Sequence, residues 1–229
     1  PTVVVAPPLA RPTPFSSGPQ AAIAPPGWIL EPIPKAKRPT RYDLVPDDGM
    51  LVLRAHAREA AASLRHGLYA DPARTPLLRW RWRTDHVLDT ADMTRRDGDD
   101  YAARLYVFFA RDEETLSLKE KTLLRIGRSR YGNALPTAAL CYVWDNRQPV
   151  DTLQDNAYTG FVKMIVATSG TAQQGRWVRL QRDVAADYRR AFGTEPPPLQ
   201  NFSLYPPTFA SLAFECAGRA HVFLTMVLP

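Results

Sequence analysis

The chain has 229 residues, 45% of them hydrophobic, which excludes a disordered protein and suits a single all-β sandwich. No run reaches the roughly 18 apolar residues that span a bilayer, so the sequence contains no transmembrane segment. The formal net charge of +6 permits anionic partners, but the basic residues form no tight run, which argues against nucleic acid.

Half of the prolines, 11 of 22, fall within residues 1–39. Proline fixes φ and removes a donor, so residues 1–26 are expected to form an extended leader that links the domain to an anchor or a neighbour. The folded domain is expected over residues 27–229. Because the chain begins at Pro1, we also expect that a signal segment was removed and that the protein is periplasmic or otherwise exported.

The first strands are predicted at residues 40–45 and 50–55, joined by a Pro-Asp-Asp-Gly turn. Residues 56–68 have apolar spacings of three and four, which predict a short helix or a strand with a helical turn. Residues 77–83 alternate strictly, so Trp80 and Trp82 should face the core and the intervening arginines should face outward.

A polar loop is expected at residues 84–100, and residues 101–110 form the next predicted strand. Helices are predicted at 116–126 and at 183–192, the second ending at Gly193. Further strands are expected at residues 137–144, 161–169, 175–180, 202–205, 211–216 and 221–228. Many short strands without regular strand–helix alternation predict an all-β, mainly antiparallel jelly-roll β-sandwich with one or two short helices.

Four segments carry a family resemblance: WRWRTD at 80–85, DGDDYAARLYVFF at 97–109, ALCYVWDN at 139–146 and RWVRLQRDVAADYRRAFG at 176–193. In this order they resemble a bacterial domain-of-unknown-function family, the one numbered 3047, from about Gly27 to Leu228. The resemblance implies an exported, galactose-binding-like jelly roll with no established activity, cofactor or catalytic residue. The family's last motif tends to be acidic, whereas this chain has LYPPT at 204–208, so the resemblance does not carry metal binding over.

Clustered carboxylates at Asp97, Asp99 and Asp100 form the first candidate site, next to Arg104 on the following strand. Aspartates in a loop can bind calcium, but the ordered calcium-loop spacing is absent. The favoured interpretation is an ion-paired cluster in which Asp99 and Asp100 contact Arg104. No other cofactor is indicated.

Trp144, Asp145 and Asn146 form a second candidate, because an aromatic face beside polar groups suits sugar binding; a core tryptophan followed by an ordinary turn is the alternative. Arg79 and Arg81, with Arg104, are expected to line one sandwich face that would attract anions.

The third candidate is the pair Arg182 and Asp183, although helix capping by itself explains this aspartate. Cys141 and Cys216 are compatible with one long-range disulfide or with two buried thiols. The four histidines show no metal-binding or triad spacing.

Three functions remain open on these observations. The first is an exported cell-envelope binding module for carbohydrate or an acidic glycan, without established catalytic activity. The second is a polysaccharide hydrolase or lyase that uses the Asp97–Asp100 carboxylates with Arg104. The third is a structural or assembly partner that binds another envelope protein.

Overall fold

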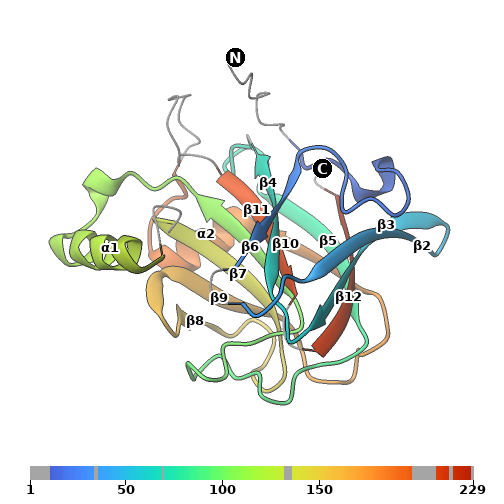
Figure 1. Ribbon diagram of the computed structural model, residues 1–229. Helices are drawn as coiled ribbons and strands as arrows, with labels where there is room; N and C mark the ends of the chain where they lie inside the picture. Colours follow the sequence, from blue (N-terminus) through green and yellow to red (C-terminus); the bar gives the residue numbers. More distant parts are fainter. Residues whose placement is uncertain are drawn as a thin grey trace.

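Two β-sheets packed face to face form the body of the protein (Figure 1). The computed structural model describes residues 11–33, 36–68, 70–131 and 136–197, and the backbone of residues 210–216 and 219–227. The predicted strand at 202–205 and the LYPPT segment lie outside the described residues.

The larger sheet has seven strands, and its adjacent strands are antiparallel except for one parallel pair, β7 and β9. Its order is β1 (Trp28–Pro32), β4 (Ala62–Leu68), β11 (Ala210–Cys216), β6 (Arg104–Phe109), β7 (Ala138–Asp145), β9 (Thr159–Ser169) and β8 (Leu153–Asn156). The five-stranded sheet is antiparallel, in the order β10 (Val178–Asp183), β5 (Leu77–Thr84), β12 (Arg219–Val227), β3 (Met50–Arg58) and β2 (Arg41–Asp47).

Most connections cross from one sheet to the other, as in jelly rolls, because consecutive strands such as β3, β4, β5 and β6 alternate between the sheets. The described residues include two α-helices, α1 (Leu118–Tyr131) and α2 (Val184–Phe192), and two 3-10 turns, Phe15–Ser17 and Glu113–Thr115. The prediction of a mainly antiparallel β-sandwich with short helices is therefore confirmed.

Tryptophans fill the space between the sheets. Trp80 and Trp82 on β5 are 3% and 0% exposed, as the alternation predicts. Trp82 packs against Trp144 on β7 with ring centroids 6.0 Å apart, and its Nε1 donates a hydrogen bond to Thr168 Oγ1 at 3.0 Å. Because each ring belongs to a different sheet, this pair joins the two layers at the centre of the core.

The polar loop predicted at 84–100 does more than connect strands. Residues 85–103, named here the covering loop, bury Leu88, Met93 and Tyr101 against the outer face of the seven-stranded sheet. This second apolar layer includes Cys141 and Met164, which face away from the main core. The seven-stranded sheet is therefore buried on both faces beneath the covering loop, which is why every residue of β7 is buried.

The expectation of an extended leader over residues 1–26 is wrong for residues 11–26. Phe15 is 2% exposed and stacks on Trp28, with ring centroids 4.7 Å apart. Thr13 accepts a hydrogen bond from the Trp28 indole at 2.9 Å, and the Thr13 amide donates to His66 Nε2 at 3.2 Å. Ala22 and Leu44 add backbone hydrogen bonding, so this segment closes one end of the sandwich; residues 1–10 lie outside the described part.

The helix considered for residues 56–68 is not formed. In its place β3 continues to Arg58 and β4 begins at Ala62. Of the alanines that suggested a helix, Ala57 is buried on β3, and Ala60 is buried in the connection that crosses to β4 on the other sheet. Both other helix predictions are confirmed. Asp183 caps α2 by accepting from the Ala186 amide at 2.8 Å, and Gly193 ends it in the left-handed conformation with φ of 71°.

Cys141 is fully buried on β7, while Cys216 ends β11. The register aligns Cys141 with Tyr106 and Tyr106 with Ala213, so β6 separates the two cysteines and Cys216 lies three residues beyond that level. Two strand spacings amount to about 10 Å, beyond the roughly 7 Å Cα separation that a disulfide tolerates. The backbone therefore does not allow this disulfide.

Neither α1 nor α2, the two α-helices of the described residues, has the length and hydropathy needed to cross a bilayer.

Candidate functional site

The outer face of β5 carries a row of arginines. Arg79, Arg81 and Arg83 alternate with the buried Leu78, Trp80 and Trp82, so strand parity turns all three guanidinium groups away from the core. This part of the prediction is confirmed.

The neighbouring strand β10 places a further arginine directly opposite this row. In the antiparallel register Arg179 is the partner of Arg81, and Gln181 is the partner of Arg79. Like charges opposite each other on adjacent strands destabilise a sheet, so this arrangement has a cost that an anion would offset. Arg79 Nε donates to Gln181 Oε1 at 2.6 Å, which orients both side chains.

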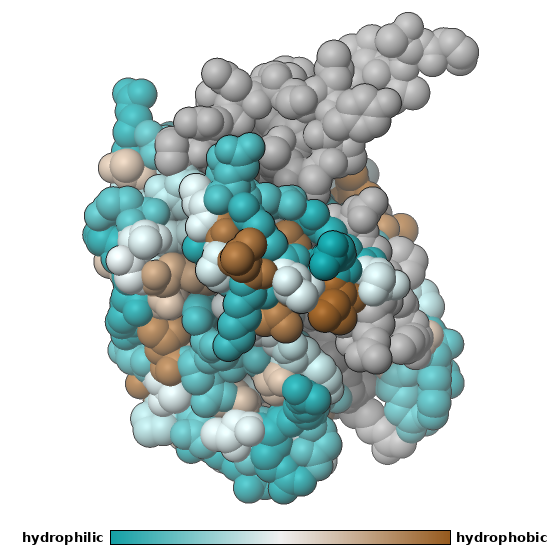
Figure 2. Space-filling view, turned by 90° about the vertical axis from the view of Figure 1, so that its left-hand side faces the viewer, coloured by the Kyte–Doolittle hydropathy of each residue, from teal (hydrophilic) through white to brown (hydrophobic). Residues whose placement is uncertain are grey.

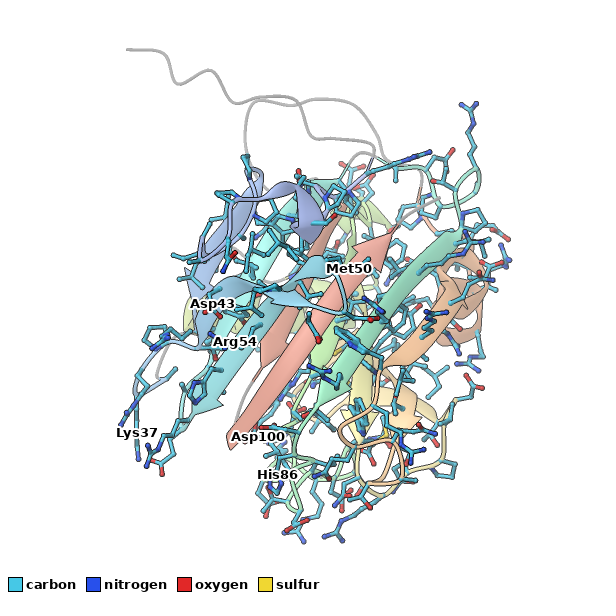
Figure 3. The ribbon with its side chains drawn as sticks, turned by 90° about the vertical axis from the view of Figure 1, so that its right-hand side faces the viewer. Lys37, Asp43, Met50, Arg54, His86 and Asp100 are labelled. Carbon is cyan, nitrogen blue, oxygen red and sulfur yellow. The ribbon has the colours of Figure 1, made fainter. Side chains whose placement is uncertain are left out.

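The β2–β3 hairpin bends toward the same face (Figure 3). Asp47 Oδ2 lies 2.9 Å from Arg83 Nη2, and Asp48 Oδ2 lies 3.6 Å from Arg81 Nη1. Neither acid belongs to a strand that pairs with β5. Met50, labelled in Figure 3, contacts Arg81 through its sulfur at 2.9 Å. The hairpin thus forms one wall of a depression over β5.

Trp177 supports the arginine row from the side of β10. The guanidinium carbons of Arg81 and Arg83 lie 4.4 Å and 5.1 Å from the centre of its ring. An arginine over a tryptophan face is held electrostatically and keeps its charge. Trp177 and the two acids of the hairpin therefore fix Arg81 and Arg83 in place.

These side chains enclose a shallow groove of about 490 Å³, called the arginine groove below. It is lined by Met50, Arg79, Trp80, Arg81, Arg179, Leu180 and Gln181. Arg79 and Arg179 are exposed and form no ion pair with another described residue. The lining therefore offers planar cationic donors and an amide to a ligand, with no carboxylate among its described residues.

The ion pair predicted between Asp99 and Arg104 is present, but it lies on a different face from the arginine row. Arg104 is 9% exposed and lies 3.4 Å from Asp99 Oδ1, and its Nη2 donates to the Asp99 carbonyl at 2.5 Å. Asn156 donates to Asp99 Oδ2 at 3.1 Å, and Arg104 also lies over the Tyr101 ring. The cluster ties the covering loop to the sheet.

Arg104 does not share a face with Arg79 and Arg81, as the sequence had led us to expect. It belongs to β6 of the seven-stranded sheet and points to that sheet's outer face, whereas the arginine row is on the other sheet. Burial raises the pKa of Asp100, with the Arg104 charge opposing this and the Asp99 charge adding to it. Asp99, the other carboxylate of this cluster, is bound to Arg104 and Asn156.

The aspartates of the covering loop do not form a calcium site. Asp97 is exposed and pairs with Arg95 at 2.5 Å, and Asp99 is engaged by Arg104. Among the described residues, no three acidic, histidine or cysteine side chains are grouped to hold a metal ion.

The interpretation of Trp144 as a sugar platform is wrong. Its side chain is fully buried, and its Nε1 donates to the Gly170 carbonyl at 3.0 Å, so the ring presents no face to a ligand. Asp145 is also fully buried and accepts from the amides of Arg147 and Gln148, both at 2.6 Å. Asn146 follows as a half-buried turn residue. The alternative of a core tryptophan and an ordinary turn is what the structure shows.

Arg182 and Asp183 lie next to each other in the chain, and both contact the start of α2. Asp183 is the helix cap, as its position suggested. Arg182 shares the inner side of β10 with Leu180 and binds Asp187 through both Nε and Nη2, at 2.8 Å and 2.6 Å. Neither residue lines the arginine groove.

Sequence reasoning found two lining residues, Arg79 and Arg81, and missed Arg179, Gln181 and Met50. The strand at 175–180 was predicted, and its Arg-x-Gln alternation was visible in the sequence. What was lacking was the pairing of β10 with β5, because the two strands are about a hundred residues apart.

Residues 26–208 match the family described as "Protein of unknown function (DUF3047)", which is most of the chain. The chain belongs to the DUF3047 family. This confirms the resemblance stated above. A search of curated proteins gave no match to this DUF3047 chain.

Three solved structures show a distant likeness to the DUF3047 fold. A carbohydrate-binding module of family 11 from a Clostridium thermocellum cellulase is 8% identical, with a TM-score of 0.41 over 96% of both chains. The xyloglucanase domain of NopAA from Sinorhizobium fredii is 8% identical, with a TM-score of 0.42 over 93% of this chain and 100% of that one. The bacteriophage CBA120 tailspike protein 4 domain is 9% identical, with a TM-score of 0.41 over 96% of this chain and 22% of that one.

Proposed function

We propose that this DUF3047 domain is an exported envelope protein that binds an acidic glycan, without catalysis, in the arginine groove. The observation that carries the proposal is the opposition of Arg81 and Arg179 across β5 and β10, with Arg79 beside them over a shallow groove. A uronate-type carboxylate can accept two parallel hydrogen bonds from one guanidinium group, and Gln181 adds an amide for hydroxyl groups.

Two features support binding over hydrolysis. The groove is shallow and its described lining has no carboxylate, whereas glycoside cleavage uses two carboxyl groups about 5–9 Å apart. The groove is also partly organised before any ligand arrives, because Trp177 and Asp48 already hold Arg81. Fixing a side chain in advance lowers the entropy that binding loses.

The experiment measures binding of polygalacturonate by isothermal titration calorimetry, beside the same polymer after chemical reduction of its carboxyl groups. The acidic polymer is expected to bind and the reduced polymer to bind at least about tenfold more weakly, since charge-assisted hydrogen bonds are lost. The variant R79A/R179A should lower affinity for the acidic polymer by at least about tenfold as well.

The matched control is R74A/R189A, which removes the same two charges from exposed arginines outside the groove. It should bind like the wild type. Equal losses in both double variants would show that only the net charge attracts the polymer, and equal binding of the reduced polymer would show that carboxylates are not recognised; either result overturns the proposal.

A further inference from the structure

Helix α1 is an insertion that projects from the sandwich. It lies between β6, which ends at Phe109, and β7, which begins at Ala138. These strands are antiparallel neighbours, which a loop of about two to five residues can join, yet residues 110–137 separate them. Figure 1 shows α1 extending at the left, away from β2, β3 and β5.

The inner side of α1 is anchored to the domain. Leu124 is 2% exposed and packs with Leu116 and Phe161 of β9 in a small apolar cluster. Two ion pairs flank this contact, Arg111 with Glu120 at 2.8 Å and Arg128 with Glu113 at 2.5 Å.

The start of α1 is fixed locally by a capping box. The Glu120 amide donates to Ser117 Oγ at 3.2 Å, while the Ser117 amide donates to Glu120 Oε2 at 2.8 Å. The helix is thus secured without any contribution from its outer side.

The outer side of α1 nevertheless carries large aliphatic residues. Leu118, Leu123 and Ile126 are 85%, 51% and 55% exposed. Leu123 and Ile126 are three residues apart, so they are neighbours on the helix surface, and Leu118 lies on the adjoining row with Thr122. Figure 2 looks onto this side of the molecule and shows apolar residues set among hydrophilic ones.

The exposed charged residues beside these aliphatic side chains on α1 are the cations Lys119, Lys121 and Arg125; Glu114, which precedes the helix, is also exposed, and its carbonyl accepts a hydrogen bond from Lys121 Nζ at 3.3 Å. The three cations form no ion pair with another described residue, while the acidic Glu113 and Glu120 are engaged on the inner side. Lys119 is four residues before Leu123, so a cation lies on the apolar row itself. A protein partner can match an apolar surface or a basic one in many ways, but an anionic phospholipid layer complements both at once.

We propose that α1 is a membrane-contact helix, which places Leu118, Leu123 and Ile126 among the acyl chains just below the headgroups of an anionic bilayer. Lys119, Lys121 and Arg125 then lie at the level of the lipid phosphates, with their aliphatic stems covering the edge of the apolar stripe. The arginine groove is on the other sheet and remains open, so this contact is independent of the proposed glycan binding.

The test is co-sedimentation of the whole protein with phosphatidylcholine vesicles that contain phosphatidylglycerol, beside vesicles of phosphatidylcholine alone. Binding to the anionic vesicles is expected, weakening as salt screens the charges. The variant L123D/I126D should lower the partition coefficient at least about tenfold, because two aliphatic side chains no longer enter the lipid. K119E/K121E/R125E should abolish the preference for anionic vesicles.

Two control variants keep the result specific. V150D places a charge on an equally exposed apolar residue, 52% exposed and outside α1, and should bind vesicles like the wild type. R79A/R179A removes two arginines from the arginine groove and should also retain vesicle binding. Loss of glycan binding can therefore be distinguished from loss of membrane binding. Circular dichroism melting checks that each variant is folded.

Three results overturn the membrane proposal. They are equal losses in V150D and L123D/I126D, loss of vesicle binding in R79A/R179A, and a wild-type oligomer that L123D/I126D converts to monomer in light scattering without any vesicle binding. The last result would assign the same helix face to contact between protein copies.

Discussion

Asp187 on α2 is the carboxylate on which the position of that helix depends. It accepts hydrogen bonds from Arg182 Nε and Nη2 at 2.8 Å and 2.6 Å, and from the Tyr142 hydroxyl of β7 at 2.8 Å. One side chain therefore links α2 to a strand of each sheet. Burial raises the pKa of Tyr142, so its hydroxyl remains a protonated donor at neutral pH. We predict that Asp187→Ala is strongly destabilising.

The expected magnitude follows from burial. The Asp187 side chain is 8% exposed and that of Arg182 is 17% exposed, so removing the carboxylate leaves a cation and a hydroxyl with little access to water. Breaking a buried ion pair in this way costs about 3–5 kcal/mol. Asp151 stays 2.5 Å from Arg182 and partly compensates its charge, so the expected loss is about 3 kcal/mol.

Equilibrium urea denaturation measures the free energy of unfolding for the wild type and each variant. Asp151→Asn is the matched control: its side chain is 55% exposed and it pairs with the same arginine, so a loss of only about 0–1 kcal/mol is expected. Asparagine also tolerates the positive φ of 68° at this position. A double-mutant cycle of Asp187→Ala with Tyr142→Phe should show coupling, since both remove the same hydrogen bond. Equal effects of Asp187→Ala and Asp151→Asn would refute the reasoning from burial.

Three further predictions concern stability. Phe15→Ala should cost about 3–5 kcal/mol in thermal or urea unfolding, whereas an undocked leader would tolerate it without change. Burial lowers the pKa of His66, and the Thr13 amide donates to its neutral ring, so the free energy of unfolding should fall as the pH drops below about 6.5. Denaturation midpoints measured from pH 5 to 8 should show this fall in the wild type and a flatter dependence in His66→Gln. Burial raises the pKa of Asp100, so its ionisation opposes folding once the pH rises above the ordinary aspartate pKa of about 4. Asp100→Asn should therefore be more stable than the wild type at pH 7, with a smaller difference at pH 4.

Strand parity was the part of the fold that the sequence could reveal. The alternation from Leu78 to Arg83 is a local property of the chain, so it identified both the buried tryptophans and the outward arginines. The capping signals of α2 are equally local, and they located its start and its end. Features whose cause lies within a few residues were predicted correctly in these cases.

Contacts between distant segments could not be read in the same way. Phe15 lies among prolines without any periodic neighbour, and only its contact with Trp28 shows that it is a core residue. Trp144 was misread because a strand buried on both faces has no alternation to indicate which residues are inside. The covering loop, which buries the second face, has the composition of a polar connection.

The arginine groove illustrates the same division in the candidate site. Each of its strands carries an ordinary pattern of exposed polar residues, and neither pattern alone distinguishes a ligand site from a solvated face. The distinction comes from the register, which sets Arg179 against Arg81 where cross-strand stability would favour an acid. Among the described residues, the acids that pair with this arginine row come from the β2–β3 hairpin, and they engage Arg81 and Arg83 while leaving Arg79 and Arg179 without an ion pair. This arrangement supports the proposed anion binding, since stability alone would favour a glutamate at position 179.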